Sequence, residues 1–183
     1  MSTPSAATAA EQIVVRRLEA SDSISEITRL LHRAYAPQVA MGLKPLAGRQ
    51  DDSVTRDRCE HSEAFVALRR AEGAKGRDRI VGIILFNEVE KVTFPSFFLK
   101  PEVAHFAQFG VDPDLQGVGI GRMLLERVEQ RARETGHVEL ALSMAEPDRK
   151  LYDFYIKRGF RFIEYWQWPY TNYRSCILSR RLE

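Results

Sequence analysis

The sequence predicts an α/β fold with one mixed β-sheet, and two observations lead to this class. Runs with strand and helix periodicity alternate in the order strand, helix, helix, three strands, helix, strand, helix, two strands. The chain has 183 residues, of which 44% are hydrophobic, and this is enough for one substantial core. We therefore expect a single domain over residues 12–183, preceded by a disordered tail over residues 1–11 that is rich in Ala, Ser and Thr.

The N-terminal part predicts a strand, two helices and a loop. Ile13–Leu18 has strand composition, and Ser23 with Glu26 has the spacing of a capping box. The helix that follows carries its apolar residues on one face: Ile24, Ile27, Leu31 and Tyr35. Proline and glycine then predict a loop over Pro37–Gly48, and loops of this length are usually functional or disordered. A short helix over Asp52–His61 follows, with Ser53 available as its N-cap.

The middle of the chain predicts a hairpin and a third strand. Two strand-like runs, Ala64–Arg69 and Arg79–Glu90, are separated by the polar, glycine-containing turn Ala71–Gly76. Val103–Val111 is a further apolar strand, and it is closed by Asp112-Pro113.

The C-terminal part predicts two helices and three strands. An amphipathic helix is indicated by apolar and small residues at helical spacing, namely Gly121, Leu124, Leu125, Val128 and Ala132, and Gly136 ends it. The remaining elements are expected as a strand over Val138–Met144, a helix over Asp148–Arg158 with Gly159 as C-cap, and strands over Phe160–Trp168 and Tyr173–Leu182 with Pro169 at the turn.

Charge, hydropathy and cysteine spacing argue against several classes of binding partner. A net charge of +2 argues against nucleic acid as the main partner. No apolar run approaches the roughly 18 residues that cross a bilayer. Cys59 and Cys176 lie far apart and lack metal-ligand spacing, which predicts a reduced compartment, the cytoplasm, and no metal site.

The glycines between a strand and a helix point to an anion site. Gly117, Gly119 and Gly121 would let backbone N–H groups at a helix start approach an anion, and a pyrophosphate is the natural guest. A tight turn that binds nothing is the alternative. The nucleoside-triphosphate loop would require Gly-Lys-Ser/Thr, but Arg122 follows Gly121, and the glycine spacing does not fit G-x-G-x-x-G.

Two motifs together resemble the GNAT superfamily of acyl-CoA-dependent N-acetyltransferases. The first is Gln116-Gly-Val-Gly-Ile-Gly121, which fits Gln/Arg-x-x-Gly-x-Gly and follows Phe-Gly-Val-Asp-Pro. The second is Leu151-Tyr-Asp-Phe-Tyr-Ile-Lys-Arg-Gly-Phe160, with one helix and one strand between the two motifs. The resemblance implies a mixed, mostly antiparallel sheet of about seven strands flanked by about four helices. It also implies acetyl transfer from acetyl-CoA to a primary amine of a small molecule, peptide or protein.

The resemblance implies a set of cofactor-binding residues. The loop amides would hold the pyrophosphate of coenzyme A, and the backbone of the preceding strand would pair with its pantetheine arm. Asp148 stands where relatives often carry an asparagine that touches this arm. The implied set is Phe109, Val111, Gln116, Gly117, Val118, Gly119, Ile120, Gly121, Arg122 and Asp148.

The resemblance also suggests catalytic residues. Tyr155 occupies the position of the family's proton donor to the leaving thiolate, although its pattern also suits a core aromatic, and Tyr152 is a weaker substitute. His105 aligns with the position of a general base. Glu88, Glu102 or an ordered water are the alternatives.

The acceptor pocket is expected between the Pro37–Gly48 loop and the C-terminal hairpin. Tyr35, Met41 and Leu43 are predicted contacts on the first side, and Trp166–Tyr173 on the other. Trp166 and Trp168 should share a strand face, where sheet packing or a homodimer interface is the alternative role. A non-catalytic acyl-CoA-binding sensor is the alternative function, and nucleophilic chemistry at a cysteine lacks an activating context.

Overall fold

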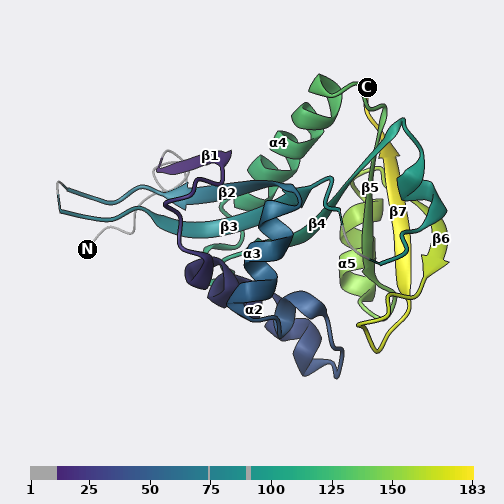
Figure 1. Cartoon of the computed structure of the whole chain (residues 1–183), viewed down its shortest axis with the longest axis horizontal. Helices are drawn as coiled ribbons and strands as arrows, with labels where there is room; N and C mark the ends of the chain where they lie inside the picture. The colour runs from purple at the N-terminus through teal and green to yellow at the C-terminus, as the bar shows by residue number, and fades with distance from the viewer. Residues whose placement is uncertain (1–11, 74, 90–91) are drawn as a thin grey trace.

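A seven-stranded sheet organises the chain in the computed structural model, which describes residues 12–73, 75–89 and 92–183 (Figure 1). Its strand order is β1-β2-β3-β4-β5-β7-β6, and the described neighbours pair antiparallel except β4 and β5, which are parallel. The strands are β1 Ile13–Arg17, β2 Glu63–Arg69, β3 Arg79–Phe86, β4 Val103–Val111, β5 Glu139–Ala145, β6 Arg161–Trp166 and β7 Ser175–Arg181. The mixed, mostly antiparallel sheet that the sequence predicted is confirmed.

Four α-helices cover the two faces of the sheet: α2 Ile24–Ala40, α3 Asp52–Glu60, α4 Ile120–Glu134 and α5 Arg149–Ile156. Alternation along β2 separates two cores. Phe65 and Ala67 pack in a cluster with residues of α4 and α5, whereas Val66 and Leu68 pack in a cluster with residues of α2 and α3. Within the described ranges, no helix is both long and apolar enough to cross a membrane.

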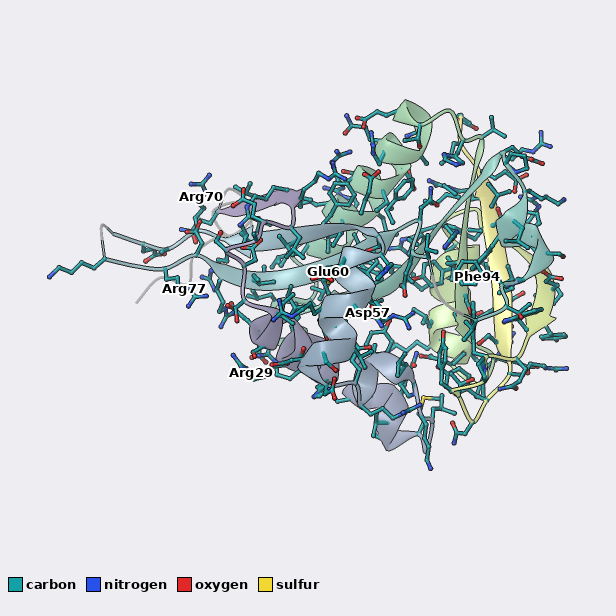
Figure 2. The ribbon with its side chains drawn as sticks, viewed as in Figure 1. Arg29, Asp57, Glu60, Arg70, Arg77 and Phe94 are labelled. Carbon is teal, nitrogen blue, oxygen red and sulfur yellow. The ribbon has the colours of Figure 1, made fainter. Side chains whose placement is uncertain are left out.

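Charged side chains cover the outer surfaces of this framework. Asp57 and Glu60 extend from the outer side of α3, and Arg70 and Arg77 lie beside the β2–β3 hairpin (Figure 2). Phe94, in contrast, lies over the C-terminal half of the sheet, where it contacts Trp168.

Two predicted boundaries are wrong for identifiable reasons. The first helix does not end at Pro37 but runs to Ala40 with Pro37 inside it, because a proline near the last turn removes one N–H donor while Met41 N still bonds Pro37 O at 3.2 Å. Asp51, not Ser53, caps α3, since the Asp51 carboxylate accepts from Val54 N at 3.0 Å.

Other ends differ by a few residues. The strand predicted to end at Glu90 ends at Phe86, and Glu90 itself lies outside the described residues, as do residues 1–11 and Ala74 of the predicted turn. The strand predicted over Phe160–Trp168 also stops earlier, at Trp166.

The two halves of the sheet part between β4 and β5. The parallel register runs from Val103↔Glu139 to Phe106↔Leu142, whereas β4 continues along β3 as far as Val111. One extra residue on β4 accompanies this divergence, because Leu85 pairs with Ala107 but Ile83 pairs with Gly110. Gln108 lies in this bulge with φ of 46°, a left-handed conformation that is uncommon for a non-glycine residue.

A buried amide pair holds the bulge. Gln108 Nε2 donates to Gln50 Oε1 at 2.8 Å, and Gln50 Nε2 donates to Gln108 Oε1 at 3.1 Å. Gln50 also donates to Thr55 Oγ1 at 2.9 Å, which links the bulge to α3. Because both amides are buried, their partners compensate for lost hydration.

We expect Gln108→Leu to lower the free energy of unfolding by about 2 kcal/mol, because it leaves the buried Gln50 amide short of a partner. Urea denaturation followed by circular dichroism measures this. Gln130→Leu, at an exposed position on α4, is the control and should change the value by less than about 0.5 kcal/mol. Equal effects of the two substitutions would contradict the anchoring role of Gln108.

Candidate functional site

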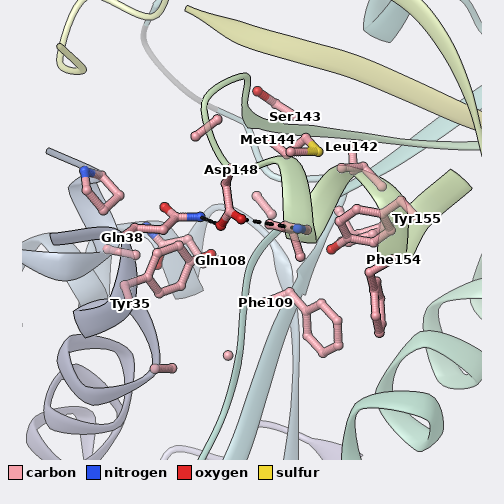
Figure 3. Close-up of a pocket in the computed structure, with 18 of the residues that line it drawn as sticks. Tyr35, Gln38, Gln108, Phe109, Leu142, Ser143, Met144, Asp148, Phe154 and Tyr155 are labelled. Carbon is pink, nitrogen blue, oxygen red and sulfur yellow. Dashed lines mark hydrogen bonds between the residues drawn. The ribbon is translucent and has the colours of Figure 1, made fainter. Parts of the chain in front are cut away.

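A cavity of about 1140 Å³ is lined by residues from both sides of the parting between β4 and β5. Figure 3 shows Tyr35 and Gln38 of α2 on one side, Phe154 and Tyr155 of α5 on the other, and Phe109 of β4 between them. Segments that are far apart in the sequence therefore line one cavity, and all the predicted cofactor-binding residues are among its lining residues.

The glycine loop forms one end of this cavity. Gly117 and Gly119 have φ values of 86° and 92°, and a Cβ built at either would meet open space. Gly119 is the N-cap of α4, makes no side-chain cap, and no acidic residue occupies the first turn of the helix. The first N–H groups of α4 thus lie at an electropositive helix end with room for an anion.

Arg122 lies at the rim of the cavity. Its side chain is 78% exposed and approaches Glu126 at 3.6 Å. Arg149 and Lys150, at the start of α5, line the cavity as well and are exposed. These side chains add positive charge to the lining of the cavity.

The free edge of β4 supplies backbone hydrogen-bonding groups. Asp112 N donates to Val81 O of β3 at 2.8 Å, so alternation directs the N–H and C=O groups of Phe109 and Val111 away from β3. The register with β5 has already ended at Phe106. An extended ligand with amide groups could therefore add to this edge.

Asp148 bridges the two sides of the cavity. Its carboxylate caps α5 by accepting from Leu151 N at 3.1 Å, and it also accepts from Gln38 Nε2 at 3.1 Å (Figure 3). Asp148 thus connects α5 to α2, a contact that the sequence did not indicate.

Tyr155 is buried and lines the cavity. Its ring contacts Phe106, Phe154 and Phe160, so it is also part of the core. Burial raises the pKa of its hydroxyl well above 10, and the nearby Tyr35 and Asp148 act in the same direction. Tyr155 is consequently protonated at neutral pH and can donate. Tyr152 lies instead against the Arg149 guanidinium at 4.3 Å and is not among the lining residues.

His105 is held neutral within an aromatic cluster. Its ring stacks on Phe98 with centroids 4.6 Å apart and meets Phe94 edge-on. Its Nε2 lies 3.0 Å from Glu88 O, a contact in which Nε2–H donates, while the buried Nδ1 has no hydrogen-bond partner among the described residues. Burial lowers the pKa of His105 to about 4.

The remaining candidate bases and nucleophiles differ in their burial and in whether they line the cavity. Glu88 is buried, lines the cavity and pairs with Arg58 at 2.6 Å. Glu102 is exposed and is not among the lining residues. Burial raises the pKa of the Cys59 thiol to about 12 and raises that of Cys176 as well, so neither is an activated nucleophile.

The acceptor side only partly matches the expectation. Tyr35 and Met41 line the cavity, but Leu43 does not. Because β6 ends at Trp166, the two tryptophans do not share a strand face; only Trp168 reaches the cavity, with its Nε1 donating to Ser143 Oγ at 2.8 Å. Sequence reasoning missed other lining residues, among them Arg58, Phe94, Phe98 and Ser143. The aromatic run at 94–98 was the available signal for two of them.

Comparison with protein families and solved structures finds similarity over most of the chain. The family model described as "Acetyltransferase (GNAT) family" matches residues 25–160. No curated protein sequence matches the chain.

Solved structures share the fold at low identity. An acetyltransferase from Streptococcus agalactiae is 17% identical with a TM-score of 0.67, covering 94% of this chain and 99% of that one. A protein from Pyrococcus horikoshii is 19% identical with a TM-score of 0.65, covering 93% and 99%. A GNAT family acetyltransferase from Elizabethkingia anophelis, solved with acetyl-CoA bound, is 16% identical with a TM-score of 0.59, covering 94% and 99%.

The buried His105 should make the protein less stable in acid. The unfolded chain protonates this histidine near pH 6.5, whereas the folded protein does not until about pH 4. Stability is therefore lost as the pH falls from 6.5 to 4, by about 3 kcal/mol in total. Denaturation at several pH values should show a shallower loss for His105→Gln than for the wild type. His61→Gln, at an exposed position, should keep the wild-type slope; a common slope for all three proteins would refute the assignment.

Proposed function

The chain belongs to the acetyltransferase (GNAT) family, and we propose that it transfers an acetyl group from acetyl-CoA to a primary amine of a small molecule or peptide. The observation that carries the proposal is the uncapped start of α4, with its two left-handed glycines opening on a cavity beside the free edge of β4. The backbone of residues 116–121 suits a pyrophosphate, and Arg122 at the rim adds charge. Phe109 and Val111 would pair with the amides of the pantetheine arm.

The proposed reaction requires the transfer of two protons away from the acceptor amine. Bound acetyl-CoA supplies an acyl group activated as a thioester: the amine nitrogen bonds to its carbon as the carbon–sulfur bond breaks. An alkylammonium gives up two protons in forming an amide, one to reach the attacking amine and one afterwards. One of these protons ends on sulfur, and the other leaves through a base or water.

We assign the donor role to Tyr155. Its hydroxyl is protonated at neutral pH, and its side chain lies opposite Tyr35 across the cavity (Figure 3). Burial raises the pKa of the Tyr35 hydroxyl, and a hydrogen bond with the Phe109 backbone acts in the opposite direction. The Tyr155 ring also contacts Phe106 of β4, so Tyr155 adjoins the strand whose next residues would hold the thioester end of the cofactor.

We assign the role of base to the Nδ1 lone pair of His105, which would accept a proton from the amine nitrogen directly or through water. With Nε2–H donating to Glu88 O, the lone pair of the ring lies on Nδ1, which is buried and has no hydrogen-bond partner among the described residues. Because the pKa of His105 is about 4, its neutral form persists throughout the physiological range. Protonation of His105 should therefore not cause the acetylation rate to fall near pH 6.5.

A second candidate function is an acyl-CoA-binding module without turnover. The Gln38–Asp148 hydrogen bond favours it, because this bond crosses the cavity between the cofactor side and the acceptor side. Thiol release measured with acetyl-CoA and a panel of amines separates the two functions. Tight cofactor binding with no turnover of any amine would favour the module.

Gly119→Ala should weaken coenzyme A binding by about tenfold or more, because its methyl group fills the space in front of the α4 N-terminus and strains the backbone. Gly136→Ala is a matched control: Gly136 also has positive φ, at 80°, and open space, but it lies beyond the other end of α4. Calorimetric titration should show the loss only for Gly119→Ala. Equal affinities of the two variants would place the pyrophosphate elsewhere.

Tyr155→Phe should lower kcat by about 100-fold, the usual contribution of a general acid, while the affinity for coenzyme A stays unchanged. The ring and its core contacts remain, so the protein should stay folded. Thiol release and calorimetry together provide the two readouts. An unchanged kcat removes Tyr155 as the proton donor.

A further inference from the structure

A second cavity adjoins the cavity described above, the main cavity. Its volume is about 400 Å³, within the range of small-molecule sites. The two cavities share four lining residues, namely Glu88, Phe94, Phe98 and His105. The described lining of the second cavity includes none of residues 109–122, which form the end suited to the cofactor. The second cavity therefore meets the main cavity at the proposed base, His105.

Three rings form the boundary between the two cavities. His105 stacks on Phe98 with centroids 4.6 Å apart, and Phe94 meets these two rings edge-on at 5.4 and 6.1 Å. Phe94 lies over the C-terminal half of the sheet (Figure 2) and is only partly buried. An apolar group that extends from the main cavity past His105 would therefore lie along aromatic surfaces.

The polar groups of the second cavity are bonded within the protein. Asn87 Oδ1 accepts from His105 N at 2.9 Å, and His105 Nε2–H donates to Glu88 O at 3.0 Å. Val89 N donates in turn to His61 O at 2.8 Å, which ties the segment after β3 to the end of α3. These bonds hold residues 87–89 around the His105 ring, so this wall of the cavity is preorganised.

The rest of the lining is aliphatic and reaches the protein surface. It comprises Val89, Val92, Leu99 and Val103. Val89 and Leu99 are each 68% exposed, the highest value for a large hydrophobic side chain among the described residues. Exposed apolar side chains that are grouped together often mark a binding site. The second cavity thus has an apolar mouth at Val89 and Leu99.

This lining favours an apolar ligand group over a polar one. A charged group would lose its hydration against aliphatic and aromatic walls, whereas each methylene that leaves water for such walls adds to binding. The proposed reaction brings the acceptor amine to His105. The substituent on the amine nitrogen is therefore the group that the second cavity is placed to receive.

We propose that the second cavity is a subsite for the acceptor, and that the acceptor is a small amine with an extended apolar chain, alkyl or arylalkyl. The inference rests on the proposed acetyl transfer and names the class of amine that this reaction would use. In this arrangement the nitrogen lies next to His105, and the chain extends along the aromatic boundary to the mouth at Val89 and Leu99. Residues that line only the second cavity act on specificity and not on proton transfer.

Matched amines test the proposal through turnover, measured as thiol release from acetyl-CoA. From n-butylamine to n-octylamine, kcat/KM should rise by about threefold for each added methylene, because each one leaves water. n-Pentylamine and 1,4-diaminobutane differ only in a terminal methyl or ammonium, and we expect the methyl to be preferred by about tenfold or more. A series that does not depend on chain length, or a preference for the diamine, overturns the proposal.

Variants at the mouth assign the effect to the second cavity. Val89→Glu/Leu99→Glu places two charges at exposed positions and should lower the kcat/KM ratio of n-octylamine to n-butylamine by about tenfold. Val39→Glu/Val138→Glu adds the same charge at side chains that are 48% and 52% exposed and line neither cavity, and it should keep the wild-type ratio. Circular dichroism verifies folding. A wild-type ratio in the mouth variant overturns the proposal.

Binding gives a readout that does not depend on turnover. With coenzyme A bound, n-octylamine should raise the Tm of the wild-type protein and of Val39→Glu/Val138→Glu more than n-butylamine does, but not that of Val89→Glu/Leu99→Glu. This Tm pattern without turnover would contradict the proposed acetyl transfer and leave the apolar subsite standing. Turnover of amines without any dependence on chain length would contradict the subsite alone.

Discussion

The parting of β4 from β5 is the constraint on which the rest of the site depends. Two parallel strands that share a register only up to Phe106 leave a backbone edge without a strand partner in the described part of the chain, and the cavity lies along it. The left-handed bulge at Gln108 turns β4 at this point, and the reciprocal amide pair with Gln50 holds it there. Local backbone strain is thus stabilised by buried hydrogen bonds from a different segment of the chain.

The two ends of the cavity differ in chemistry. One end presents the N-terminus of α4, bare glycines and exposed basic side chains such as Arg122, a combination suited to phosphate groups. The other end presents aromatic rings around the buried Arg58–Glu88 pair. Tyr155 and Tyr35 lie between these ends, with hydroxyl groups kept protonated by burial. The division supports a polyanionic donor at one end and an amine acceptor at the other.

Much of the fold was predictable because its signals are local. The alternation of Phe65 and Val66 between opposite faces, the helical spacing along α4 and the positive φ of Gly119 and Gly136 all follow from neighbouring residues. Pro37 shows the limit of such signals: a proline indicates a helix end, yet the helix continues because only one hydrogen bond is lost near its last turn.

The sequence by itself determined the element order, the glycine loop and the position of Tyr155. Only the tertiary structure decided that His105 is neutral, that Asp148 bonds Gln38 and that Arg58 meets Glu88 inside the cavity. The reason is physical. Backbone conformation and amphipathic periodicity depend on residues a few positions apart, whereas burial, charge pairing and pocket shape depend on the register of strands and the packing of helices from distant segments.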